Sequence, residues 1–290
     1  MTVKIITDSA ADLPKETAAQ RGIDVVPLLV YLGETEYQDN VTLQPEDLFR
    51  GMREGNVYKT SQPLYGSFES AFRAAADEPD GAVYVAFSSA LSGTHQTSLL
   101  ARDALESELP NLKLSVVDSK CASAGLGLVA LKAAELAATG ASREQVARAA
   151  ERWARHMEHL FTVDDLAYLV RGGRVSPVAA FIGGLLNIKP LLHVEDGKLV
   201  PLEKVRGRKK VFERMLDLME ERGANLAGQT IAISHGDDPE AAELLRSMIE
   251  ARFGCSKFLV TPIGAAVGAH AGPGTIALFF LNADESELSE

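Results

Sequence analysis

The stretch from Ala82 to Gln96 constrains the fold more than any other part of the chain. Residues 82–87 (AVYVAF) are apolar and uncharged, which predicts a strand buried on both faces of a parallel sheet. A hydroxyl-rich turn at 88–94 follows, and then a segment from about His95 to Leu105 that suits a helix. In open parallel α/β sheets, ligands bind beyond the carboxyl ends of the strands, where helix N–H groups are free. This stretch therefore predicts an anion-binding loop, although Ser92 and Thr94 would equally suit an ordinary helix cap.

Strand, polar loop and helix recur through the first half, which indicates an N-terminal parallel α/β/α domain. The predicted strands are 3–7, 24–32, 82–87 and 114–117. Helices are predicted at 14–21, 45–55, 95–105 and 123–138. A loop at 59–63 introduces another helix, which carries Phe68 to Ala75. A last helix is capped by Ser142 and Gln145 and carries Val146, Trp153, Met157 and Leu160 on one side.

The second half has a different pattern, which predicts a C-terminal mixed-sheet α/β domain. The loop Arg171–Arg174 (RGGR) precedes an apolar helix from Ser176 to Leu186. A hairpin is expected from 188–194 and 199–205 around Glu195–Lys198. Helices 209–222 and 238–254 and strands 230–234, 257–261 and 275–281 complete this half. We place the domain boundary near residue 160, giving domains 1–160 and 161–290.

Composition excludes several classes of protein. A net charge of -11 and a pI near 5.1 argue against general nucleic-acid binding, which requires neutralised phosphates. No apolar segment is long enough to span a bilayer, and no signal peptide precedes the first strand, so we expect a cytoplasmic protein. Cys121 and Cys255 lack the spacing of a disulfide framework or a zinc site. The basic residues concentrated between 171 and 210 form either a binding surface or a solvated face.

Five motifs together resemble one family. They are DSAADLP at 8–14, TSQP at 60–63, SSALSGTHQ at 88–96, RGGR at 171–174 and GAHAGPGT at 268–275. In this order the chain is similar, over essentially its whole length, to the DegV family of bacterial fatty-acid-binding proteins. Two positions depart from the family pattern: Ala271 replaces a frequent hydroxyl residue, and Leu64-Tyr65 replace a smaller or Pro-containing pair.

The resemblance implies a two-domain protein that encloses one long-chain fatty acid at the domain junction. It also implies that a separate fatty-acid kinase phosphorylates the carboxylate, as a phospholipid precursor, while this chain has no catalytic residue, metal or cofactor of its own. Transient membrane contact is compatible with this role. The ligand-binding positions carried over are Thr60, Ser61, Ser92, Gly93, Thr94, His270 and Arg206, and the partner-docking positions are Arg171 and Arg174.

Physical chemistry gives these assignments a rationale. A carboxylate at the mouth of an apolar cavity loses hydration and needs hydrogen-bond donors, which Thr60, Ser92 and His270 supply. The acyl chain supplies most of the affinity, at roughly 0.8 kcal/mol per buried CH₂. Phe181, Ile182, Leu185 and Leu186 are candidates to line the cavity, and ordinary core packing explains them equally well.

Purely structural roles would also explain individual residues of these motifs. A His before Ala-Gly-Pro-Gly suits a turn, and a Thr before Ser-Gln-Pro suits the entry of a helix. Asp8, Ser9 and Asp12 are interpreted as caps of the following helix.

Two other functions use part of the same residue set. An acyl ester hydrolase would use Ser92 as nucleophile and His270 as base, but Ser92 lies outside a G-x-S-x-G elbow. A nucleotide-binding kinase subunit would need a phosphate loop, and the sequence holds no G-x-x-x-x-G-K-[ST] string. Fatty-acid binding therefore stands as the main expectation, with hydrolysis as its alternative.

Overall fold

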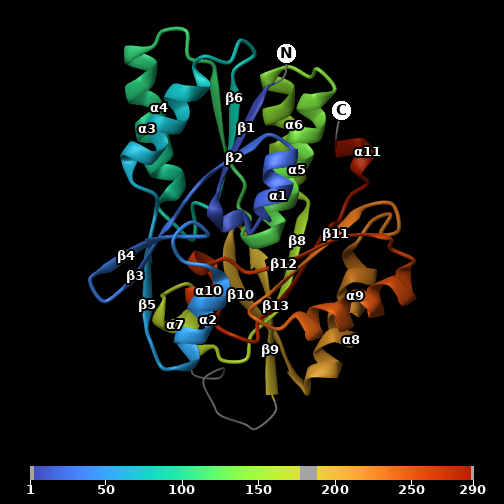
Figure 1. Cartoon of the computed structure of the whole chain (residues 1–290). Helices are drawn as coiled ribbons and strands as arrows, with labels where there is room; N and C mark the ends of the chain where they lie inside the picture. The colour runs from blue at the N-terminus through green and yellow to red at the C-terminus, as the bar shows by residue number, and fades with distance from the viewer. Residues whose placement is uncertain (1–2, 177–187, 289–290) are drawn as a thin grey trace.

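The computed structural model describes residues 3–176 and 188–288 (Figure 1). A four-stranded parallel sheet has the order β2-β1-β6-β7, formed by β1 (Lys4–Asp8), β2 (Ile23–Val26), β6 (Ala82–Ala86) and β7 (Leu114–Asp118). This confirms the parallel α/β prediction, including the buried strand at residues 82–86.

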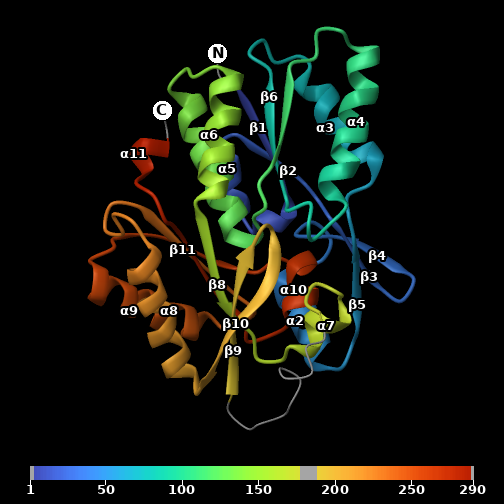
Figure 2. The same cartoon turned by 180° about the vertical axis from the view of Figure 1, so that it is seen from behind.

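Alternation along these strands decides which helices cover which face. Ile6 and Tyr84 pack against α3 (Tyr65–Ala75), which lies beside α4 (Thr94–Glu108). Ile5, Val83 and Val85 face the opposite way, toward α5 (Ser123–Ala138) and α6 (Arg143–Arg155). The short helices η1 (Ser9–Ala11) and α1 (Lys15–Gln20) follow β1. The parallel sheet therefore lies between two helical layers (Figure 2).

The second sheet has six strands in the order β10-β9-β8-β13-β11-β12. They are β8 (Met157–Thr162), β9 (Ile188–Glu195), β10 (Lys198–Arg206), β11 (Thr230–His235), β12 (Lys257–Pro262) and β13 (Ile276–Leu281). The β11–β12 pair is parallel and the other pairs are antiparallel, so the prediction of a mixed sheet with a 188–206 hairpin is confirmed.

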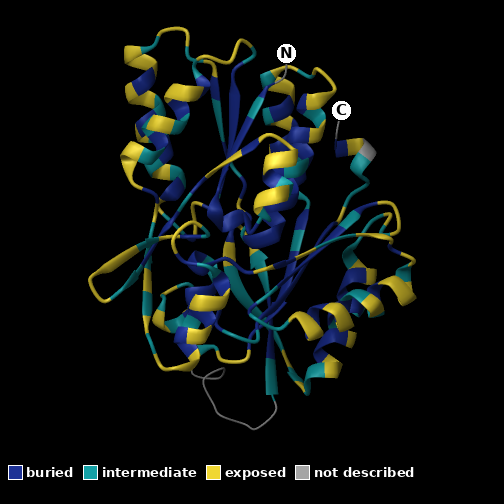
Figure 3. Ribbon diagram, viewed as in Figure 1, coloured by how far each residue is buried: buried dark blue, intermediate teal, exposed yellow. Residues whose placement is uncertain are grey.

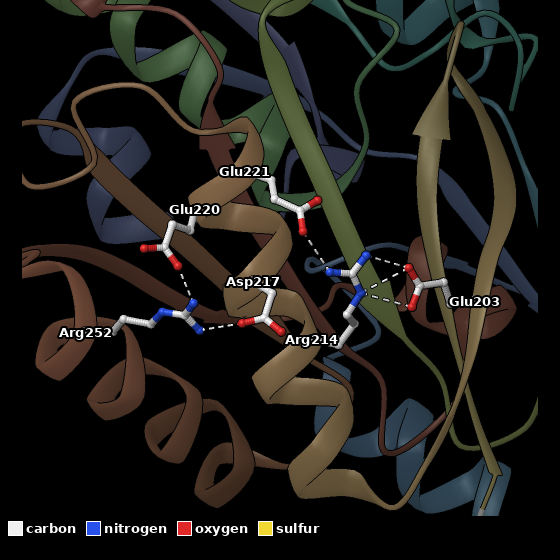
Figure 4. A network of polar contacts seen from close by, with 6 residues as sticks. All are labelled: Glu203, Arg214, Asp217, Glu220, Glu221 and Arg252. Atoms are coloured by element: carbon white, nitrogen blue, oxygen red, sulfur yellow. Dashed lines mark hydrogen bonds and ion pairs between the residues drawn. The ribbon is translucent and has the colours of Figure 1, made fainter.

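Helices α8 (Arg208–Arg222) and α9 (Pro239–Phe253) cover one face of the six-stranded sheet. Leu160, Leu278 and Phe280 point into this layer. Ion pairs also join these elements (Figure 4). Arg214 of α8 pairs with Glu203 of β10 and with Glu221. Arg252 of α9 pairs with Asp217 and Glu220 of α8. These ion pairs are exposed or only partly buried, so each adds at most about 1 kcal/mol, and apolar burial holds the two helices on the sheet.

A third, smaller sheet lies beside the junction. It pairs β3 (Leu29–Leu32) with β4 (Thr35–Gln38) and β5 (Tyr58–Ser61). Around it lie α2 (Pro45–Arg53), α7 (Ala167–Arg171) and α10 (Ala265–Ala271), and α11 (Glu285–Leu288) ends the described chain. Buried residues run along the strands and inner helix faces, and exposed residues mark the outer helix faces (Figure 3).

Three expectations from the sequence were wrong in detail. The strand expected at 24–32 is two strands in different sheets, separated at Pro27, which has no N–H group for a central ladder. Residues 59–61 form part of β5 rather than a loop. Met157 and Leu160 lie on β8 rather than on a helix, because α6 ends at Arg155. The capping box of Ser142 and Gln145 is present.

Two expectations from the sequence stay predictions. The helix expected through Leu186, with Phe181, Ile182, Leu185 and Leu186, lies outside the described residues. The domain boundary at residue 160 falls inside β8, and a division before Met157 would keep the six-stranded sheet whole. Among the helices described, none is both long enough and apolar enough to cross a membrane.

Helix α5 packs on both large sheets, and a glycine permits this contact. A Cβ at Gly125 would lie 2.6 Å from Nε2 of His159 and 2.8 Å from Cδ1 of Phe279, both on the six-stranded sheet. We expect Gly125→Ala to lower the free energy of unfolding by about 1 to 3 kcal/mol through overpacking, measured by urea denaturation.

Gly66→Ala is the matched control, because a Cβ at Gly66 in α3 meets nothing within 4 Å. The better helix propensity of Ala should raise the free energy of unfolding by up to about 1 kcal/mol. Equal effects of the two substitutions would contradict the proposed close contact at Gly125.

Candidate functional site

A cavity of about 190 Å³ lies between the carboxyl-end loops of the parallel strands and the inner face of the six-stranded sheet. An apolar cavity of about 150 Å³ can stay dry and accept benzene, so this space suits an apolar group. Most side chains around it are apolar. They include Leu28, Phe87, Leu91, Phe161, Leu169, Val194, Leu199, Ile263, Ala266, Val267, Ala277 and Phe279.

The period of two along β8 and β13 creates the cavity floor. Phe161 pairs with Ala277, and His159 pairs with Phe279, and all four side chains face the cavity. Their neighbours face α8 and α9 instead. The same strands thus build a solid core on one side of the sheet and a hollow on the other.

Polar side chains gather where β5, α10 and the loop after β6 meet the cavity. Thr60 of β5 and His270 of α10 are joined by a hydrogen bond of 2.6 Å between Oγ1 and Nε2. Ser61, Ser92 and Gly93 also line the cavity. The structure therefore brings together five of the seven ligand-binding positions expected from the sequence.

The other two positions lie differently. Thr94 is fully buried behind the loop, and its hydroxyl lies 2.8 Å from that of Ser92. Ser92 Oγ also accepts the Thr94 N–H at 3.3 Å, so Ser92 stabilises the turn before α4 in addition to lining the cavity. Arg206 ends β10, is exposed and does not appear among the residues that line the cavity.

His270 lies near the C-terminal end of α10, a helix that the sequence analysis did not predict. Burial, together with the positive charges of Arg174 and Arg171, lowers the pKa of His270 to about 4. The ring is therefore neutral at pH 7. A Cβ at residue 172 would lie 2.1 Å from Nδ1 of His270, so Gly172 is required for this close approach.

Arg174 lines the cavity, whereas Arg171 is not among the lining residues. Nε of Arg174 donates to the Leu91 carbonyl at 3.1 Å and Nη1 donates to the Gly172 carbonyl at 2.6 Å. Burial lowers the pKa of Arg174, and its side chain lines the cavity. Arg171 is exposed, with its guanidinium 4.9 Å from the centre of the Tyr168 ring. The sequence motif alone did not distinguish these two arginines.

Another histidine, His159, lines the cavity on the strand side, and the sequence analysis missed it. Its Nδ1 donates to the Met157 carbonyl at 3.0 Å, and its Nε2 accepts the Ala122 N–H at 3.3 Å. Burial lowers the pKa of His159 to about 4, so this ring is also neutral. The run Leu160–Val163 (LFTV), rich in strand-forming residues, was the signal that could have placed it.

The polar end can hold an anion and offers little for other chemistry. The Ser92 hydroxyl bonds Thr94, and His270 bonds Thr60, so the described contacts do not pair Ser92 with His270 as nucleophile and base. Within the described ranges, no group of three or more His, Cys, Asp or Glu side chains is placed to hold a metal ion.

Known proteins resemble this chain over almost its whole length. The model of a family described as "Uncharacterised protein, DegV family" matches residues 2–283. A DegV domain-containing protein of Clostridium perfringens is 40% identical over 280 residues, which cover 96% of each chain.

Solved structures share the fold. A DegV family protein of Thermus thermophilus, described for its fatty acid binding, has a TM-score of 0.87 and 33% identity, covering 96% of this chain and 99% of its own. The Fatty Acid Kinase (Fak) B3 protein of Streptococcus pneumoniae, solved loaded with linoleic acid, has a TM-score of 0.85 and 25% identity, covering 98% of this chain and 100% of its own. From the family match and the relatives of similar length, this chain belongs to the DegV family.

Proposed function

We propose that this protein binds a long-chain fatty acid, with the acyl chain in the cavity and the carboxylate at the end formed by Thr60, Ser92, His270 and Arg174. The observation that carries the proposal is the gathering of these polar side chains at an otherwise apolar cavity. The fatty acids bound by the Thermus thermophilus and Streptococcus pneumoniae neighbours support it. The proposed location is the cytoplasm.

The electrostatics of this end favour a carboxylate over a neutral group. An ion that leaves water needs charge and hydrogen bonds in return. Arg174 is held toward the cavity by two backbone carbonyls, and neither contact neutralises its charge. A carboxylate placed there would gain a charge-assisted hydrogen bond, which is about twice as strong as a neutral one. We therefore assign the cationic role to Arg174, in place of the exposed Arg206.

We further propose that a separate fatty-acid kinase phosphorylates the bound carboxylate, and that this chain is not itself an enzyme. The name of the Streptococcus pneumoniae neighbour supports a link to such a kinase. Arg171 and Arg206 are exposed, which makes them suitable for contact with a partner. The bonds of Ser92 to Thr94 and of His270 to Thr60 favour binding over the alternative of ester hydrolysis.

The first test separates the two arginines. Arg174→Met should weaken the binding of oleate at least tenfold and that of oleyl alcohol less than twofold, because the alcohol carries no charge. Arg171→Met, the control from the same motif, should leave both affinities unchanged and lower the rate of phosphorylation by the kinase. Competition with a fluorescent fatty acid measures the affinities. An equal loss of acid and alcohol binding in Arg174→Met would reject the charge assignment.

The second test concerns the Thr60–His270 hydrogen bond. Thr60→Val keeps the shape and removes the hydroxyl, at a cost of about 0.5 to 1.5 kcal/mol, so oleate affinity should fall roughly two- to twelvefold. Thr139→Val is the control, because Thr139 is an exposed residue at the C-terminus of α5. Unchanged affinity in Thr60→Val would remove this residue from the proposed site.

The third test uses the lowered pKa of His270, which is about 4 in the ligand-free protein. A carboxylate beside the ring favours its protonated form and raises this pKa. Binding of oleate at pH 6 should therefore take up a fraction of a proton, and affinity should increase as the pH falls from 8 to 6.

Calorimetry at pH 6 in two buffers of different ionisation enthalpy measures this uptake. His270→Gln should abolish the uptake, while His156→Gln, which changes a partly exposed histidine outside the cavity lining, should retain it. Equal uptake by the wild type and His270→Gln would show that His270 is not the group that takes up the proton.

A further inference from the structure

Three buried aspartates lie behind the candidate site: Asp8, Asp12 and Asp39, with exposures of 0%, 2% and 1%. Two of them reach the helix that carries His270. Oδ1 of Asp12 accepts the Gly264 N–H at 2.8 Å, and Oδ1 of Asp39 accepts the Ala265 N–H at 2.7 Å. Carboxylates from two distant segments therefore hold the first amides of α10.

Helix α10 has little stability of its own. It has seven residues and contains Gly268, and its N-cap residue is Gly264, which offers no side-chain cap. Isolated helices of this length do not persist in water, and their first N–H groups need partners. A Cβ at Gly264 would lie 2.8 Å from Oδ1 of Asp12, so this end of α10 fits closely against the carboxylate.

Hydroxyl groups in turn fix the two carboxylates. Ser9 Oγ donates to Oδ2 of Asp39 at 2.7 Å and accepts the Leu28 N–H at 3.0 Å. Ser123 Oγ donates to Oδ2 of Asp12 and lies 2.8 Å from Ser234 Oγ. The network thus links η1, α5 and β11 to the start of α10, and so defines the position of this helix along its axis.

We propose that Asp12 and Asp39 are positioning residues for His270, which they hold against Thr60 by fixing α10. Ala265 and His270 are five residues apart, about 7.5 Å along a helix, so the carboxylates act through the helix and not on the ligand directly. The importance of this positioning for ligand binding rests on the proposed function. The positioning itself is a property of the ligand-free protein.

Asp8 provides a matched control within the same cluster. Its carboxylate accepts from Tyr84 Oη, Phe87 N and Ala10 N, and the described contacts give it no bond to α10. Burial raises the pKa of both Asp8 and Asp39 to about 6. Asp8→Asn therefore removes a comparable buried carboxyl group from the same cluster without touching the helix.

The experiment is an NMR titration of the His270 ring in the ligand-free wild type and in Asp12→Asn, Asp39→Asn and Asp8→Asn. A displaced α10 would expose the ring, so its pKa should rise from about 4 toward the ordinary 6.5 in the first two variants and stay unchanged in Asp8→Asn. Because burial raises the pKa of Asp39 to about 6, its carboxyl group is already neutral where the ring titrates, so a change of charge cannot imitate this rise. A lowered pKa, an unchanged one, or equal shifts in all three variants would overturn the proposal.

A double-mutant cycle connects the positioning to the ligand. Asp39→Asn should lower oleate affinity about fivefold in the wild type and less than twofold in His270→Gln, because the two changes act through one side chain. Full additivity would overturn the proposal. If the wild type bound no oleate, the proposed function would fail while the titration still decided the positioning.

Ser9→Ala keeps the proposal testable if an aspartate variant does not fold. It leaves the carboxylate of Asp39 in place and removes one of its donors. The pKa of His270 should then rise by less than in Asp39→Asn. A pKa identical to that of the wild type would count against the network.

Discussion

The hydrogen bond between Thr60 and His270 joins residues 210 positions apart, and the candidate site depends on it. It connects the small sheet that contains β5 to α10, and so closes one end of the cavity. Both partners are partly buried, and an unpaired polar group that is fully buried would cost about 1 to 3 kcal/mol. A bond that satisfies both groups in the ligand-free protein also keeps them aligned for an incoming anion.

The guanidinium of Arg174 is the fixed positive charge at the polar end of the cavity. His270 is neutral at pH 7 because it is buried beside Arg174 and Arg171, and Arg174 is held by carbonyls that leave its charge uncompensated. In a protein of net charge -11, such a cation at an apolar cavity is a local departure from the overall charge. The proposed specificity for a carboxylate follows from this local field and not from the composition.

The sequence predicted those parts of the molecule whose determinants are local. The buried strand at residues 82–86, the hydroxyl-rich loop after it and the capping box at Ser142 depend on neighbouring residues. Helix α10 was missed because its stabilising carboxylates come from residues 12 and 39. Strand β8 was missed because Met157 and Leu160 continue the spacing of the preceding helix. Arg174 lines the cavity and Arg171 does not, a difference that depends on tertiary contacts such as the bond of Arg174 to Leu91, which a four-residue motif does not encode.

Helix α5 has a consequence for how the molecule folds. Its residues share one hydrophobic cluster with Val83 and Val85 of the parallel sheet and with Phe161 and Phe279 of the six-stranded sheet. Neither half would retain this cluster if the chain were divided. The two large sheets therefore share one hydrophobic core across their junction, and within the described residues no separate linker divides that core. The cavity between the two sheets is lined by residues of both halves, so it exists only where the two halves pack against each other.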